Sequence, residues 1–184
     1  MKKLSLLALP VLFALGCGGV DSLFGDGGID GGPCAAGVTP YQIKTGTGYA
    51  TSKVSAGPVE DCGLGLTAAN LVGSTREVAN SGQGIISIYS LGTSSKLLLG
   101  SGSINCNVGT LTSSGVKFTA NGCDMTLTTT VAVTVTGPSQ MDYAVDQNRS
   151  NFTQDPTPGA MACAYLKAPV KNSCKITYTA TMVQ

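Results

Sequence analysis

The chain has 184 residues, enough for one ordinary domain and too few for two domains with separate cores. Its 11 Lys and Arg against 10 Asp and Glu give a formal charge of +1, which excludes the basic excess that nucleic-acid binding requires. With 42% hydrophobic and only 11% charged residues, it is not a disordered chain. The absence of His removes the usual catalytic base and the commonest zinc ligand.

Residues 1–16 have the pattern of an export signal. Two lysines precede an apolar run from Leu4 to Leu15, and the small residue Gly16 follows it. The apolar run is only about half as long as the roughly 20 residues that a membrane-spanning helix needs. We therefore interpret residues 1–16 as a signal peptide and not as an anchor helix.

The segment Ala14-Leu15-Gly16-Cys17 resembles the lipobox of bacterial lipoproteins. In that family, signal peptidase II cuts before the cysteine, which carries diacylglycerol and acyl chains such as palmitate. The resemblance implies that Cys17 is lipidated and that the protein is a bacterial lipoprotein anchored at the cell envelope. Gly18 after the cysteine is compatible with export to the outer membrane, facing the periplasm or the cell surface.

Residues 17–33 are rich in glycine and interrupted by aspartates, a composition typical of a flexible linker. We expect them to tether a single folded domain, residues 34–184, to the lipidated cysteine. Asp26 and Asp30 among glycines match only part of a calcium-binding repeat, and one partial unit cannot enclose an ion.

Six cysteines remain in the domain, an even number that suits three disulfides in an oxidising compartment. Six cysteines allow 15 pairings, so the spacing does not settle the connectivity. Order along the chain suggests neighbouring pairs, and no Cys-x-x-Cys motif supports a metal site. The suggested pairs are Cys34–Cys62, Cys106–Cys123 and Cys163–Cys174.

Two hairpin registers compete around the middle pair of cysteines. A turn at Ser114-Gly115 would place Cys106 opposite Cys123, at a separation that a disulfide spans. A turn at Asn121-Gly122, the stronger hairpin signal, would instead pair Phe118 with Met125 and Val116 with Leu127. Gly122 could also form a bulge in the longer hairpin.

The clearest predicted element is a strand over residues 125–136. Apolar residues and threonines alternate through it, the pattern of a strand with one buried and one exposed face. The same alternation returns at Met141–Asp146 and Lys175–Met182, so three strands have one apolar and one polar face. The inward residues are predicted to be Met125, Leu127, Thr129, Val131, Val133, Val135, Met141, Tyr143, Val145, Ile176, Tyr178, Ala180 and Met182.

Weaker strand signals and a helix candidate fill the rest of the domain. The helix candidate is Thr67–Ala79, which includes Leu71, Val72, Arg76 and Val78 and is weakened by Gly73. No βαβ rhythm appears, so we predict an all-β fold, an antiparallel β-sandwich or small β-barrel stapled by disulfides. The weaker strands are Tyr41–Thr45, Tyr49–Val54, Ile85–Leu91, Lys96–Leu99, Ile104–Thr112, Val116–Ala120 and Ala162–Lys167.

Catalytic motifs occur only as fragments. The sequence from Ser114 to Lys117 matches the S-x-x-K of penicillin-recognising enzymes, but it falls on a predicted hairpin and not at the start of a helix. Asp142 and Asp146 are expected on the outer face of one strand, where they do not oppose each other as a catalytic pair. We therefore expect no catalytic residues, cofactor or metal, and a hydrolase is the least favoured function.

The sequence favours a non-enzymatic envelope lipoprotein whose β-domain is a binding or structural surface module. The alternative is a lipocalin-like carrier that holds an apolar ligand inside a barrel. A carrier predicts an internal cavity, whereas a surface module predicts a filled core and an exposed patch. The expected partners are the membrane, through the lipid anchor, and an envelope protein or an apolar ligand.

Overall fold

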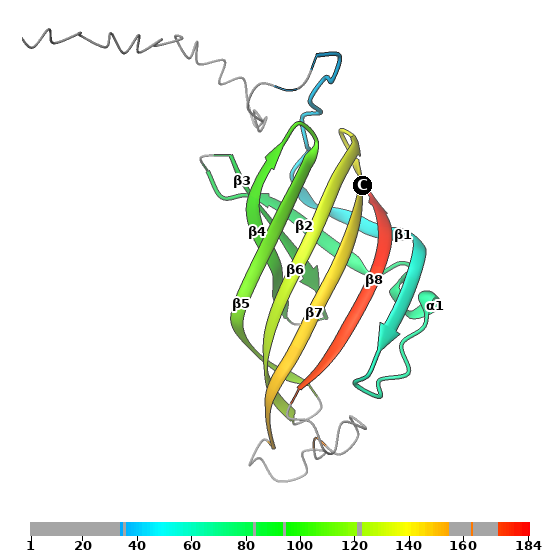
Figure 1. Ribbon diagram of the computed structural model, residues 1–184, viewed down its shortest axis with the longest axis vertical. Helices are drawn as coiled ribbons and strands as arrows, with labels where there is room; N and C mark the ends of the chain where they lie inside the picture. The colour runs from blue at the N-terminus through cyan, green and yellow to red at the C-terminus, as the bar shows by residue number, and fades with distance from the viewer. Residues whose placement is uncertain are drawn as a thin grey trace, which may run out of the picture.

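The computed structural model describes residues 34, 36–82, 84–93, 95–120, 123–154, 163 and 173–184. Eight antiparallel strands form one sheet in which each strand pairs with the next and β8 pairs with β1, which closes a barrel (Figure 1). The predicted all-β fold is confirmed, as a barrel. The strands are β1 (Gly46–Glu60), β2 (Thr75–Asn80), β3 (Ile85–Leu91), β4 (Lys96–Asn105), β5 (Val108–Ala120), β6 (Cys123–Gly137), β7 (Gln140–Gln154) and β8 (Ser173–Val183).

Alternation of side chains determines which residues face the interior. In β6, every second residue from Cys123 to Val135 is buried, and the threonines between them are exposed or half-buried. Strands β7 and β8 continue the same inward faces through cross-strand pairs such as Val133 with Tyr143 and Tyr143 with Ala180. The inward faces predicted for these three strands are confirmed.

The beginning of strand β1 pairs with β2, and the rest of the strand pairs with β8. Residues 46–50 pair with β2, and the ladder with β8 runs from Ala50 to Glu60. Strand β2 has 6 residues, whereas β6 and β7 have 15 each. The barrel is therefore closed around its upper half, the end that holds Asn105 and Val183, while β1 and β2 separate toward the lower end that holds Cys123 and Glu60.

A segment before β1 covers the upper end of the barrel (Figure 1). The backbone N–H of Lys44 donates to the carbonyl of Pro138, the Tyr49 hydroxyl donates to the carbonyl of Lys44, and Asn107 bonds the backbone of Thr39 and Tyr41. The segment has no strand pairing, so the predicted strand at Tyr41–Thr45 is wrong.

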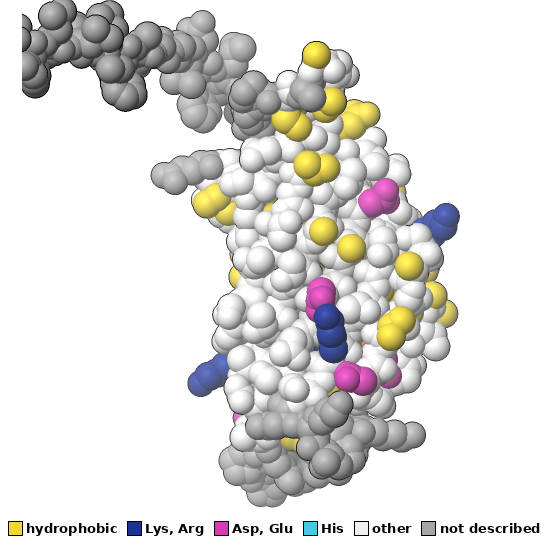
Figure 2. All heavy atoms as spheres, in the orientation of Figure 1, with side chains coloured by type: hydrophobic (Ala, Val, Ile, Leu, Met, Phe, Trp, Pro, Cys, Tyr) yellow, Lys and Arg dark blue, Asp and Glu magenta, His cyan; other side chains and the backbone are white. Residues whose placement is uncertain are grey.

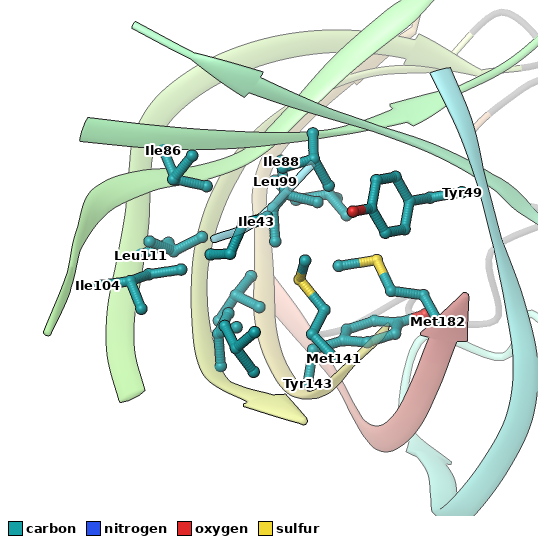
Figure 3. Close-up of a cluster of buried hydrophobic side chains, with 14 of the residues drawn as sticks. Ile43, Tyr49, Ile86, Ile88, Leu99, Ile104, Leu111, Met141, Tyr143 and Met182 are labelled. Carbon is teal, nitrogen blue, oxygen red and sulfur yellow. The ribbon is translucent and has the colours of Figure 1, made fainter. Parts of the chain in front are cut away.

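The side chain of Ile43 enters the upper barrel and is 3% exposed. It meets aliphatic side chains, two methionines and two tyrosines, which fill the upper interior (Figure 3). Buried members of this upper core are Ile43, Tyr49, Val78, Ile86, Ile88, Leu99, Ile104, Leu111, Val131, Val133, Val135, Met141, Tyr143, Val145, Ala180 and Met182.

The region predicted as one strand, Ile104–Thr112, is a hairpin. Strand β4 ends at Asn105 and β5 begins at Val108, so Cys106 and Asn107 form a two-residue turn. Both turn residues have positive φ, 51° and 72°, as in the type I′ turn that matches the twist of paired strands. The sequence signal was obscured because neither residue is glycine.

The register of β5 against β6 decides between the two predicted turns, Ser114-Gly115 and Asn121-Gly122. Phe118 pairs with Met125 and Val116 pairs with Leu127, as the Asn121-Gly122 turn predicts, although those two turn residues lie outside the described part. The alternative turn at Ser114-Gly115 is wrong. The register shifts between Ser113 and Val116, and Gly115 has a φ of +69°, so this site is a bulge within β5.

Three disulfides are present, but none joins the neighbouring pairs suggested by sequence order. The bonds are Cys34–Cys106, Cys62–Cys174 and Cys123–Cys163. The predicted bond between Cys106 and Cys123 is excluded because these residues flank opposite ends of β5, whose 13 residues extend about 40 Å. The predicted pairs Cys34–Cys62 and Cys163–Cys174 are also wrong, because each of these cysteines is bonded to another partner.

The predicted helix over Thr67–Ala79 is also wrong. A single helical turn, α1 (Ala68–Leu71), begins at a capping box in which Thr67 and Asn70 bond each other's backbone N–H groups. Gly73 then adopts a φ of +79°, which ends the helical turn, and Thr75 begins β2. In that strand Arg76 and Val78 face the interior together.

Several expectations concern residues outside the described part: the signal peptide, the tether with Cys17, and the strand at Ala162–Lys167. Among the described residues, no helix has both the length and the apolar character needed to span a membrane.

Peptide mapping without reduction is expected to recover the linkages Cys34–Cys106, Cys62–Cys174 and Cys123–Cys163. Replacing Cys62 and Cys174 together by Ala should lower the free energy of unfolding by about 4 kcal/mol, because that bond closes a loop with a sequence separation of 112. Removing Cys123 and Cys163, separated by 40, should cost about 1 kcal/mol less. Urea unfolding measures both values, and a peptide linking Cys34 to Cys62 would contradict the topology.

Candidate functional site

A layer of polar side chains crosses the barrel at the lower edge of the upper core and shares Tyr143 with it. Its members come from β1, β2, β3, β7 and β8 and from the residue before β2, and most lie on inward faces of strands that are otherwise apolar. We call this set the polar layer. It consists of Thr51, Ser74, Arg76, Ser90, Tyr143 and Tyr178.

Hydroxyl groups of the polar layer form a chain with a fixed direction. The Ser74 hydroxyl donates to the carbonyl of Leu71, so its oxygen must accept from Thr51 at 3.0 Å. The Thr51 oxygen in turn lies 2.6 Å from the Tyr143 hydroxyl and accepts its proton. Each proton in the chain points away from Tyr143 toward Leu71, so the Tyr143 oxygen is left to accept hydrogen bonds.

Arg76 is the charged member of the polar layer and is 3% exposed. Its Nη1 donates to the carbonyl of Thr75 at 2.9 Å and to the Ser90 hydroxyl at 3.2 Å. Its Nε is buried and has no acceptor. The only ion pairs among the described residues are Lys96–Glu77 and Lys175–Asp146, so no described carboxylate forms a salt bridge with Arg76.

Tyr178 lies beside this guanidinium and meets the ring of Tyr143 edge-on at 5.9 Å between centroids. Burial raises the pKa of Tyr178 to about 12, and Tyr143 adds to the increase, while the positive charge of Arg76 opposes it. The phenol is therefore neutral at physiological pH.

A second inward arginine lies lower on β7. The Nε of Arg149 donates to Gln147 at 3.1 Å, and Gln147 donates to the Thr129 hydroxyl at 3.3 Å. Arg76 and Arg149 are the only arginines in the sequence, and both are on inward faces, since Arg149 pairs with Leu127 and with Cys174. The interior thus takes both guanidinium groups, the cations best suited to buried hydrogen bonding.

Below the polar layer, two apolar clusters share Leu64 and Phe152. One is centred on Cys123, Met125 and Leu127, and the other on Cys62, Cys174 and Ile176. We call them the lower clusters. They are completed by side chains that are only partly buried: Leu64, Leu66, Leu97, Val116, Phe118, Phe152, Cys163 and Tyr178.

The loop after β1 contains Glu60, Asp61 and Cys62. Burial raises the pKa of Glu60, but hydrogen bonding from the backbone N–H groups of residues 62–65 outweighs it, and the pKa is lower than usual. Asp61 lies with Cys62 and Cys174 in a group of possible metal ligands. The two cysteines are joined to each other in a disulfide, so they offer no thiolate to a metal.

The outer face of β6, β7 and β8 is a second candidate site. It carries mainly threonine and alanine and few charges (Figure 2). Where it meets β1, it is hollowed into a shallow groove of about 380 Å³. We call this the outer groove. Its lining includes Ala56, Gly57, Val59, Thr130, Ala132, Ala144, Asp146, Thr177 and Thr179.

The structure does not bring the fragmentary catalytic motifs together. Ser114 and Lys117 both lie in β5 and not on a helix. Ser114 is within the bulge, and Lys117 is in the paired region that follows it. Asp146 forms an ion pair with Lys175 at 2.7 Å on the outer face, and Asp142 accepts from Thr181. These acids are engaged in contacts across neighbouring strands.

Sequence reasoning missed the polar layer. Arg76 was placed in the predicted helix, so its alternation with Val78 was not used. Tyr143 and Tyr178 were correctly placed inside, but only as core residues. The available signal was an arginine on the apolar side of an alternating pattern, both at Arg76 and at Arg149.

Stability at high pH is expected to depend on Tyr178. Its pKa of about 12 in the folded chain exceeds the ordinary value of 10, so the unfolded chain ionises first. The contribution is complete below pH 10 and is lost as the pH rises to about 12. Urea unfolding from pH 9 upward should show a steeper loss for the wild type than for Tyr178→Phe. Tyr41→Phe, at an exposed tyrosine, is the control, and equal slopes for wild type and Tyr178→Phe would contradict the assignment.

Comparison of this chain with protein-family models, curated proteins and solved structures finds no match. Its candidate sites are therefore defined by their own geometry: a polar layer inside the barrel and an outer groove of small side chains.

Proposed function

We propose that the protein is a non-enzymatic lipoprotein of the cell envelope whose barrel is a binding module. The observation that carries this proposal is the outer groove. Its alanines and threonines are small, so a partner surface can approach the sheet closely. Its lining is mostly uncharged, so little desolvation cost opposes binding.

Two further features support a role at the outer surface. The upper core is filled by side chains, and the segment that carries Ile43 covers the upper end, which opposes storage of a ligand there. The three disulfides brace both ends of the barrel, as suits a domain in an oxidising compartment.

The lipid anchor gives the domain an orientation. A flexible tether of residues 17–33 would span about 20–25 Å between Cys17 and the domain. The domain begins at Cys34, which is bonded to Cys106 in the turn at the upper end. We therefore place the upper end toward the membrane, with the outer groove along the side and the lower end facing away.

Replacing Cys17 by Ser is expected to release the protein from the membrane, because the cysteine of the lipobox-like segment is the one that would carry the acyl chains. Membrane and soluble fractions should be compared by immunoblot, with Ser22→Ala in the same segment as the control. The mass of the amino-terminal peptide reports lipidation directly. Continued membrane association of Cys17→Ser would refute the anchor.

Replacing Ala144 by Arg is expected to fill the outer groove and reduce partner binding about tenfold or more, because a bulky charge must then be desolvated at the contact. Ser103→Arg, at an exposed position on β4 away from the groove, is the matched control. Cross-linking in native envelopes followed by quantitative mass spectrometry measures the partners. If both variants retain the same partners at wild-type levels, the groove is not the binding site.

A further inference from the structure

Within the described part of the chain, no carboxylate forms a salt bridge with Arg76 to balance its charge. A guanidinium that is 3% exposed has lost its water, and burial of an ion costs several kcal/mol unless it is paired. All hydrogen-bonding partners found for Arg76 are neutral: the Thr75 carbonyl, the Ser90 hydroxyl and the neighbouring Tyr178 phenol. These dipoles reduce the cost but leave a net positive charge inside the barrel.

Two described lysines, in contrast, are paired with carboxylates. Lys96 pairs with Glu77 at 2.6 Å and Lys175 pairs with Asp146 at 2.7 Å, both on the exposed surface. Glu60 is the only acidic residue of β1, and its Oε1 accepts from the backbone N–H of Gly65 at 2.9 Å. Its other oxygen, Oε2, is buried without a hydrogen-bond partner, and no salt bridge joins Glu60 to Arg76.

The unpartnered Nε–H of Arg76 indicates which edge of the guanidinium could bind an anion. Nη1 is used by Thr75 and Ser90, while Nε–H has no acceptor. The Nε side of a guanidinium is one of the edges that binds a carboxylate with two parallel hydrogen bonds. A single negative charge on that edge would satisfy the unpartnered donor and neutralise the residue.

Two neighbours of Arg76 connect it to apolar side chains. Tyr178, beside Arg76, packs against both the upper core and the lower clusters. Ser90, which accepts from Arg76, pairs across the sheet with Leu97, and Leu97 belongs to the lower clusters. An anion held at Arg76 is thus next to apolar side chains that are only partly buried.

We propose that the polar layer binds the carboxylate of an amphiphile, such as a fatty acid, through Arg76, with the acyl chain lying against the lower clusters. This site is separate from the outer groove and does not depend on the proposed surface-binding function.

Binding of 11-(dansylamino)undecanoic acid to the full chain, purified in a neutral detergent, tests the site. Its methyl ester is the matched neutral probe. The acid should bind about tenfold tighter or more, because the ester lacks the charge-assisted hydrogen bonds to Arg76. Dodecanoate should displace the acid, whereas acetate should not. Equal affinity for acid and ester, or no binding of the acid, would overturn the proposal.

Variants assign the effect to Arg76. Arg76→Met keeps an unbranched side chain and should abolish the preference for the acid, whereas Lys53→Met, at an exposed cation on β1, should preserve it. Near-ultraviolet circular dichroism checks folding. If Arg76→Met does not fold, Arg76→Lys replaces it and should bind the acid more weakly than the wild type, because the two-pronged edge is lost. A variant that folds and keeps the full preference would refute the assignment.

Competition by related anions defines the ligand class. Dodecyl phosphate and a lysophosphatidylglycerol present an anionic phosphate on an acyl chain, and dodecanoate should displace the probe at lower concentration than either. Displacement by acetate or inorganic phosphate at the same concentration as dodecanoate would overturn the role of the lower clusters. Stronger displacement by the phosphate lipids would overturn the choice of a carboxylate.

Discussion

The pairing of β1 with β8 is the constraint on which the rest of the structure depends. Without it, β1 and β8 would be two long exposed edges, which favour aggregation. Residues from Ala50 to Glu60 satisfy the edge of β8, but several register shifts are needed along the way. One lies where Gly57 approaches the backbone so closely that an added Cβ would be 2.8 Å from the Thr177 carbonyl oxygen. Closure therefore requires glycine at this point of contact.

Strand length then divides the interior into two regions. The short strand β2 closes the sheet only where the upper core lies, so that region is fully enclosed and filled by close-packed side chains. Farther down, β1 continues with β8 alone, and loop residues such as Leu64 and Leu66 complete the lower clusters. Arg76 lies near the start of β2, at the boundary between these regions. The polar layer therefore lies where the fully enclosed upper core gives way to the less enclosed lower clusters.

Period-two patterns in β6, β7 and β8 predicted the all-β class and the inward residues, because one-sided burial leaves a direct record in sequence. The pairing of cysteines that are distant in sequence has no comparable sequence pattern. Cys106 lies in a turn and Cys62 lies beyond β1, so their partners depend on which strand ends meet in space. The polar layer was hidden for a related reason: Leu71, Val72 and Arg76 fit a helical spacing, and only the tertiary position of Gly73 and Thr75 makes that region a turn followed by a strand.

The disulfides help to explain how the fold retains the buried Arg76. An uncompensated guanidinium opposes folding, so the sheet must be stable enough to hold it. Cys62–Cys174 ties the end of β1 to the start of β8, and Cys123–Cys163 ties the start of β6 to the segment beyond β7, so both bonds restrain the region below Arg76. The hydrogen bonds that Arg76 donates to the Thr75 carbonyl and the Ser90 hydroxyl hold its guanidinium in place. A site built this way is already oriented before an anion arrives, so little of the binding energy would be spent on ordering it.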